Sequence, residues 1–203
     1  MDQISKKTKM ISQKLKELKN KFNHYNIDGY LVPKNDEYFS EFAQKDKLET
    51  ITGFNGSYGL AVILKKKNYL FVDGRYVEQA KIQVGKRFKI LEIPKKLPYQ
   101  ILSSRLNLGF DPMVFTSKSL LYFFRNKIKL TPITKTIINS DILKGHSSKK
   151  FYSLSPKVVG ETVKSKIKRL TQILKKDGSD HIFISAPENV AWLLNIRGRD
   201  NPF

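Results

Sequence analysis

Apolar residues at the start of the chain recur at helical intervals. They are separated by three, four or seven positions, in the order Ile4, Ile11, Leu15, Leu18, Phe22 and Tyr25. Residues spaced in this way share one face of an α-helix. The sequence therefore predicts a helix over residues 4–25 that packs one apolar stripe against the rest of the protein.

A turn and a short apolar run follow this helix. Residues 26–29 contain an Asn and a Gly, which favour a turn, and Tyr30-Leu31-Val32 predicts a short buried strand. Beyond Val32 we expect a second, short helix. It would be capped by Asn35 or Asp36 and run through Phe42.

Short β-rich runs alternate with helical patterns in the middle of the chain. Strands are expected at residues 58–64, 69–72, 87–93, 108–110 and 130–134. Helices are expected at residues 76–84 and 117–126. The polar residues 65–68 have the length of a hairpin loop. This order favours an α/β fold with three layers, in which the hairpin makes the sheet mixed rather than purely parallel.

The opening pattern returns about 152 positions later. A helix at 157–176, a turn at 177–180, a strand at 182–185 and a helix at 187–195 repeat the first layout. The sequence thus predicts an internal duplication. We expect a first domain at residues 1–141, a linker at 142–155 and a second, similar domain at 156–203.

The second copy ends at Phe203, where its own hairpin would begin. A helix, a strand and a helix cannot bury their apolar faces alone. We therefore expect the second domain to be incomplete. Residues 156–203 would dock on the first domain, be completed by another chain, or remain partly disordered.

The formal net charge of +20 suggests a polyanionic partner such as RNA, DNA or an anionic membrane surface. However, 31 of the 38 basic residues are Lys and only seven are Arg, whereas specific phosphate or base recognition favours the arginine fork. The lysines are also scattered in twos and threes. This pattern is as typical of a general lysine bias as of a binding patch, so nonspecific nucleic-acid binding is an alternative hypothesis.

The residue types present limit the chemistry. Without cysteine there is no disulfide, zinc-thiolate site or thiol nucleophile. The histidines, His24, His146 and His181, are more typical of surface or packing positions than of metal ligands. The sequence therefore predicts no metal site and no catalytic residue. Since neither a signal peptide nor a membrane span is evident, we expect a cytoplasmic protein without membrane contact.

Two polar segments are candidate binding sites. The first, residues 52–57, contains two glycines and Asn55, and is also typical of a simple connector into the hairpin. The second is Asp73-Gly74-Arg75-Tyr76 at the end of a predicted strand. Asp73 can cap the next helix and Arg75 can pair with a carboxylate, so a structural role competes with substrate contact.

These segments resemble, in order and spacing, the N-terminal part of Xaa-Pro aminopeptidase, also called aminopeptidase P. The resemblance covers nearly the whole chain. Its motifs are Asp28-Gly29-Tyr30-Leu31-Val32-Pro33, Asn35-Asp36-Glu37, Ser40-Glu41, Thr52-Gly53-Phe54-Asn55-Gly56-Ser57, Asp73-Gly74-Arg75-Tyr76, Gly109-Phe110-Asp111-Pro112 and the run 191–200. It implies a creatinase/prolidase-like N-terminal domain followed by the start of a second such domain.

In the family a third domain, with the pita-bread fold, supplies two Asp, one His and two Glu to a pair of divalent metals, usually manganese. The resemblance implies that this chain is truncated before that domain and inactive alone. The complete enzyme would remove the first residue from peptides whose second residue is proline. The chain would be a non-catalytic fragment that shapes the substrate cleft and assembles the oligomer.

The resemblance also names site residues. In relatives an arginine of this region reaches toward a neighbouring subunit's active site, and Arg75 is the matching candidate. Asp73, Tyr76 and Asn55 are expected to contribute to the same cleft or subunit contact. The expected partners are further copies of the chain or a pita-bread catalytic domain. An alternative is that the chain binds a separately encoded catalytic chain.

Overall fold

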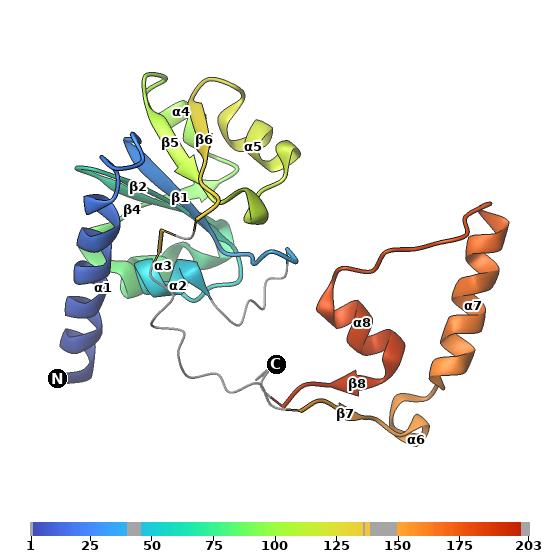
Figure 1. Ribbon diagram of the computed structural model, residues 1–203. Coiled ribbons are helices and arrows are strands. Elements are labelled where there is room, and N and C mark those ends of the chain that lie inside the picture. Colours follow the sequence, from blue (N-terminus) through green and yellow to red (C-terminus); the bar gives the residue numbers. More distant parts are fainter. Residues whose placement is uncertain (1, 40–45, 136, 139–149, 200–203) are drawn as a thin grey trace. The chain divides into compact units, whose positions relative to one another are not determined.

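The computed structural model describes residues 2–39, 46–135, 137–138 and 150–199. The chain forms two compact units (Figure 1). Unit 1 comprises residues 1–37 and 41–142, and unit 2 comprises residues 38–40 and 143–203. The predicted linker at 142–155 lies largely outside the described residues, so its boundaries stay a prediction.

Unit 1 is built on a six-stranded mixed sheet in the order β4-β3-β2-β1-β5-β6. Strands β1, β2 and β3 pair in antiparallel fashion, and the other neighbours pair in parallel. The strands are β1 (Gly29–Pro33), β2 (Gly59–Leu64), β3 (Asn68–Asp73), β4 (Lys89–Ile93), β5 (Asn107–Phe110) and β6 (Lys129–Pro132). The predicted mixed α/β fold is therefore confirmed.

Helices cover both faces of this sheet (Figure 1). One face carries α1 (Asp2–Asn20), α2 (Lys47–Thr52) and α3 (Val77–Val84). The other carries α4 (Pro98–Ile101) and α5 (Ser117–Phe124). The result is the three-layer arrangement that the alternation of strands and helices predicts.

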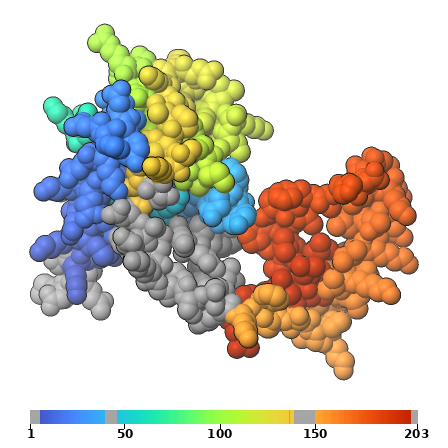
Figure 2. Space-filling view, in the orientation of Figure 1, coloured from blue at the N-terminus to red at the C-terminus, as the bar shows by residue number. Residues whose placement is uncertain are grey.

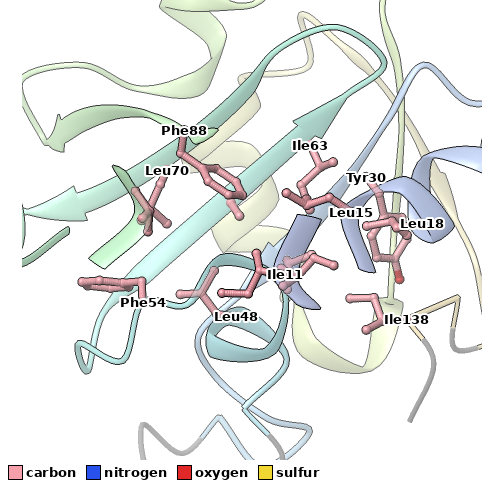
Figure 3. Close-up of a cluster of buried hydrophobic side chains, with 14 of the residues drawn as sticks. Ile11, Leu15, Leu18, Tyr30, Leu48, Phe54, Ile63, Leu70, Phe88 and Ile138 are labelled. Atoms are coloured by element: carbon pink, nitrogen blue, oxygen red, sulfur yellow. The ribbon is translucent and has the colours of Figure 1, made fainter. Parts of the chain in front are cut away.

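The central strands are buried on both sides, and their residues alternate between two cores. Tyr30, Val32 and Ile63 belong to the core under α1 and α2, whereas Leu31 and Val62 belong to the core under α5. Figure 3 shows Ile11, Leu15 and Leu18 of α1 in the first core, near Tyr30 and Ile63. The amphipathic stripe of the N-terminal helix thus covers one face of the sheet.

The N-terminal helix is shorter than predicted. It ends at Asn20, and residues 21–26 form turns. Asn26 has a φ of 50°, and the Ile27 amide donates to the Phe22 carbonyl at 3.0 Å. The apolar spacing continues through Tyr25 because Phe22 still packs into the core from the turn. Burial, rather than helical geometry, therefore explains the last part of the pattern.

The short helix expected through Phe42 is also a wrong prediction in its described part. Residues 37 and 38 form a turn, and residues 40–42 lie outside the described residues. The helix instead begins at Lys47. Asp46 caps it by accepting from the Glu49 amide at 2.8 Å, and Gly53 ends it with a φ of 84°.

Unit 2 contains α6 (Pro156–Val159), α7 (Val163–Lys176) and α8 (Pro187–Leu194), with a small sheet of β7 (Tyr152–Ser153) and β8 (Ile196–Arg197). The single helix predicted at 157–176 is interrupted at Gly160, whose φ is 79° and which ends α6. The Thr162 side chain then accepts a hydrogen bond from the Ser165 backbone amide and caps the start of α7. The strand predicted at 182–185 is wrong for the described residues, because no neighbouring strand pairs with it there.

A buried lysine joins two helices of unit 2. The Lys166 side chain is only 4% exposed, and its Nζ donates to the Trp192 carbonyl and to Asn195 Oδ1, both at 2.7 Å. The ammonium also lies 4.1 Å from the centre of the Trp192 ring. These charge-assisted bonds and the cation–π contact join α7 to the end of α8.

We predict that Phe54→Ala lowers the free energy of unfolding of unit 1 by about 3–5 kcal/mol, because it leaves a cavity in a fully buried position. Ile82→Ala, at an 83% exposed position of α3, should change it by less than about 0.5 kcal/mol. Urea unfolding followed by circular dichroism measures both. Equal effects of the two variants would contradict the assigned core.

Candidate functional site

The candidate site of unit 1 lies at the edge of the sheet where β3 ends, and its geometry begins with Asp73. Its carboxylate accepts from the Arg75 amide at 2.9 Å and caps the 3-10 turn Gly74–Tyr76. Because β1, β3 and β5 run in the same direction, their carboxyl ends meet at this edge. Edges of this kind commonly hold binding residues in α/β sheets.

Arg75 is held by the same carboxylate. Its Nη2 donates to Asp73 Oδ2 at 2.7 Å, and its Nε lies 3.2 Å from each carboxylate oxygen. The guanidinium is also 5.2 Å from the centre of the Tyr76 ring. The Arg75 side chain is nevertheless 73% exposed. An exposed and oriented guanidinium is suited to binding a carboxylate or carbonyl oxygen of another molecule.

The Arg75 guanidinium and backbone amide hold the pKa of the Asp73 carboxyl below its ordinary value. The stabilisation that this gives is present above the unfolded pKa of an aspartate and is lost as the pH falls through the folded pKa. The pair is therefore intact at neutral pH and weakens only in acid. Since it is exposed to solvent, its role is to orient the guanidinium rather than to stabilise the fold.

Tyr76 joins the end of β3 to the loop before β2. Its hydroxyl and that of Ser57 are 2.8 Å apart, and its ring meets the ring of Phe54 edge-on with centres 5.9 Å apart. Gly56 permits this packing, because a Cβ there would come within 2.2 Å of the Phe54 ring. The 52–57 segment therefore packs beside the Asp73–Tyr76 segment.

Asn55 is bonded to α3. Its side-chain Oδ1 accepts from Gln79 Nε2 and Gln83 Nε2, both at 2.8 Å, and its backbone amide donates to Gln83 Oε1 at 3.1 Å. Within the described residues these bonds attach the 52–57 segment to α3 through Asn55. The two glutamines belong to no sequence motif, so no pattern in the sequence indicated this network.

Tyr58 is a further residue of this edge that the sequence analysis did not single out. Burial raises the pKa of its hydroxyl, with smaller contributions from Tyr122 and Asp73. Tyr58 directly precedes Gly59, which pairs with Val72 near the end of β3, so Tyr58 lies at the same edge as the candidate site. The only sequence signal was its position directly after the 52–57 segment.

Among residues 2–39, 46–135, 137–138 and 150–199, no group of three or more histidine or carboxylate side chains is arranged to hold a metal ion. His24 and His181 are exposed, and His146 lies outside the described residues. The helices in the described part of the chain include none with the length and apolar character needed to span a membrane. The arrangement around Arg75 can bind and orient a group of another molecule.

We predict that Arg75→Gln raises the pKa of the Asp73 carboxyl toward its ordinary value, because the ion pair is the main cause of the depression. NMR titration of the side-chain carboxyl carbon measures this shift. Lys81→Gln, at an exposed lysine of α3 that pairs with Glu78, is the matched control. An unchanged Asp73 pKa in Arg75→Gln would show that Arg75 does not hold this carboxylate.

Known proteins and domain families resemble this chain over most of its length. A sequence profile described as the creatinase/prolidase N-terminal domain matches residues 14–140, and a second profile with the same description matches residues 144–203. A probable Xaa-Pro aminopeptidase P of Fusarium vanettenii is 30% identical over 95% of this chain. Xaa-Pro aminopeptidase 1 of Dictyostelium discoideum is 28% identical, also over 95% of the chain. In each case the match covers 34% of the relative, so the chain spans about a third of the length of the curated relatives it matches.

The crystal structure of X-prolyl aminopeptidase from Caenorhabditis elegans, described as a cytosolic enzyme with a di-nuclear active site, matches 95% of this chain. The TM-score is 0.79, the sequence identity is 25%, and 35% of that enzyme is covered. The N-terminal domain of a putative metallopeptidase from Corynebacterium diphtheriae shares the fold of 62% of the chain, with a TM-score of 0.52 and 20% identity. The chain is thus homologous to the N-terminal region of Xaa-Pro aminopeptidases, and it belongs to the creatinase/prolidase N-terminal domain family.

Proposed function

We propose that this chain is the non-catalytic N-terminal part of a Xaa-Pro aminopeptidase, in which it shapes the substrate cleft and assembles the oligomer. The complete enzyme would remove the first residue from peptides whose second residue is proline. The observation that carries the proposal is the exposed Arg75 guanidinium, oriented by Asp73 and Tyr76 at the carboxyl edge of the sheet. We place the complete enzyme in the cytoplasm.

The role of Arg75 follows from its chemistry. A peptide substrate presents carbonyl oxygens and a terminal carboxylate, and a guanidinium binds either with two parallel hydrogen bonds. Asp73 restricts the rotation of the arginine side chain, which reduces the entropy lost on binding. Arg75 would therefore contact the peptide in the cleft, or the neighbouring subunit that borders it. Asp73 and Tyr76 are the residues that position it, and Asn55 anchors the adjacent loop.

The described residues of this chain contain no group of three or more histidine or carboxylate side chains that could hold the metal pair of such an enzyme. The Asp73 carboxylate at the candidate site accepts from the side chain and the backbone amide of Arg75. We propose that a pita-bread catalytic domain carries a pair of divalent ions, manganese or another metal. The contribution of this chain is then binding and orientation, and no chemical step is assigned to it.

Unit 2 offers a surface for assembly. It exposes large apolar side chains that a protein usually covers: Phe151, Val158, Ile167, Ile173, Ile182, Phe183, Trp192 and Leu194. Phe183 is 90% exposed and lies in the segment at 182–185 that has the composition of a strand. We infer that this surface contacts the catalytic domain, whether that domain is part of the same protein or of a separately encoded chain.

We predict that the purified chain releases no amino acid from an Xaa-Pro-Xaa peptide, with or without added manganese, because the metal ligands belong to the catalytic domain. The assay is amino-acid release followed by chromatography. The wild-type C. elegans enzyme under the same conditions is the positive control. Metal-dependent turnover that copurifies with this chain would overturn the assignment of a non-catalytic role.

We also predict the activity of a chimera in which residues 1–203 of this chain replace the matching part of the C. elegans enzyme. This chimera should turn over the Xaa-Pro-Xaa peptide. In this chimera Arg75→Ala should lower kcat/KM at least about tenfold, since a charge-assisted bond contributes about 1.5–3 kcal/mol. Steady-state kinetics on the Xaa-Pro-Xaa peptide measure the effect.

Arg105→Ala is the matched control for this experiment, because Arg105 is an exposed arginine that precedes β5 and therefore lies at the opposite edge of the sheet. Its kcat/KM should stay within about twofold of the unchanged chimera. Sedimentation of both variants reports whether any loss comes from the substrate contact or from assembly. An Arg75→Ala chimera with full activity and unchanged assembly would exclude both proposed roles of Arg75.

A further inference from the structure

We propose that a pocket at the opposite edge of unit 1 binds a small phosphate-bearing anion. The pocket has a volume of about 400 Å³. It is lined by α1, by the start of β3 and by the turn before β4, through Ser12, Leu15, Lys16, Lys19, Asn20, Asn68 and Arg87. Helix α1, blue in Figure 2, lies on the surface of unit 1.

The composition of this pocket selects for an anion. Three of its seven lining residues, Lys16, Lys19 and Arg87, are cations, and none is an acid. Three others, Ser12, Asn20 and Asn68, carry groups that form hydrogen bonds. A phosphate group combines more than one negative charge at pH 7 with several acceptor oxygens, so it satisfies more of these residues than a carboxylate does.

The cations lack acidic partners within the described part of the chain. Lys19 Nζ donates to the Lys65 carbonyl at 3.3 Å, and Arg87 Nη2 donates to the Gln83 carbonyl, also at 3.3 Å. Both bonds are long and end on neutral oxygens. In the described residues neither Lys16, Lys19 nor Arg87 forms a salt bridge. Structural ion pairs therefore do not explain why these three charges line one pocket.

Arg87 is also incompletely satisfied as a donor. Its Nε is enclosed and has no hydrogen-bond partner in the described residues, and the same is true of Asn68 Oδ1. The Asn68 amide is oriented by its Nδ2, which donates to the Arg87 carbonyl at 3.0 Å. With only one long side-chain bond to retain it, the guanidinium can turn toward an anion at little cost.

Partial burial makes an anion more favourable still. Desolvation lowers the pKa of both Lys19 and Arg87, which means that their charged forms are less stable here than in water. A bound anion would reverse this penalty. The hairpin Lys65-Lys66-Lys67, reached by the Lys19 ammonium, adds exposed positive charge next to the pocket and would attract an anion from solution.

The site is separate from the one proposed above. Asn68 begins β3, whereas Asp73 ends it, so the two sites lie at opposite ends of the same strand. The phosphate group could belong to a free small molecule or to a nucleic-acid backbone. The lining combines cations with hydrogen-bonding side chains, which favours the small molecule, since nonspecific contact with a polymer needs only a row of cations.

The test uses the full 203-residue chain and isothermal titration with inorganic pyrophosphate and inorganic phosphate, at constant ionic strength set by chloride. We expect saturable one-site binding of pyrophosphate. Arg87→Gln and Lys19→Gln should each weaken it at least about tenfold, as expected for the loss of a charge-assisted bond. Lys19→Gln changes a half-buried side chain on the surface of α1 and leaves the turn before β4 intact, so it remains informative if Arg87→Gln disturbs folding.

The controls are Arg105→Gln and Lys118→Gln, which remove the same charges at exposed positions away from the pocket and should change the affinity by less than about twofold. Equal weakening in all four variants, or no saturation against chloride, would mean that net charge alone attracts the anion and would overturn the proposal. So would tight binding of a short oligonucleotide that pyrophosphate does not displace. Arg75→Ala should leave pyrophosphate binding unchanged, which separates this result from any failure of the proposed peptidase role.

Discussion

The position of β1 at the centre of the sheet governs the rest of unit 1. One edge of β1 pairs with β2 in antiparallel fashion and the other pairs with β5 in parallel. The space at its first residue is so small that a Cβ on Gly29 would come within 2.5 Å of Leu64 Cδ2 and 2.7 Å of the Ile63 carbonyl oxygen. Mutual bonds between Asp28 and Asn107, at 2.8 and 2.9 Å, fix the register with β5. Because Asn68 and Asp73 lie at opposite ends of β3, the Arg75 site and the cationic pocket fall at opposite edges of this sheet.

Local patterns predicted the elements of unit 1 where burial and secondary structure give the same signal. The runs that became β2 and β3 are apolar on both faces, and the polar residues between them formed the expected hairpin. The pattern failed where these signals separate. Phe22 is buried from a turn, so it extended the apparent helix, whereas α2 has six residues and too few turns to show a period.

The candidate site was predictable only in its local part. Asp73 caps the turn and pairs with Arg75, as their residue types indicate, because the two residues are only two positions apart in the chain. The bond between Ser57 and Tyr76 and the amide network of Asn55 depend on how β2, β3 and α3 pack, which no short motif encodes. The same holds for Arg87 and Lys19, whose shared pocket exists only in the folded sheet. In unit 2 the strand-like segment at 182–185 shows the converse, since propensity alone does not form a strand without a hydrogen-bonding neighbour.

The mixed pairing of β1 has a consequence for synthesis on the ribosome. The antiparallel edge can pair early, because β2 and β3 follow β1 closely and are joined by a short hairpin. The parallel edge must wait for residues such as Asn107, 79 positions beyond its partner Asp28. Closing so long a loop slows folding, and an unpaired strand edge is a template for association with other chains. During that interval the nascent chain therefore presents one open edge of a strand that is fully buried in the folded protein.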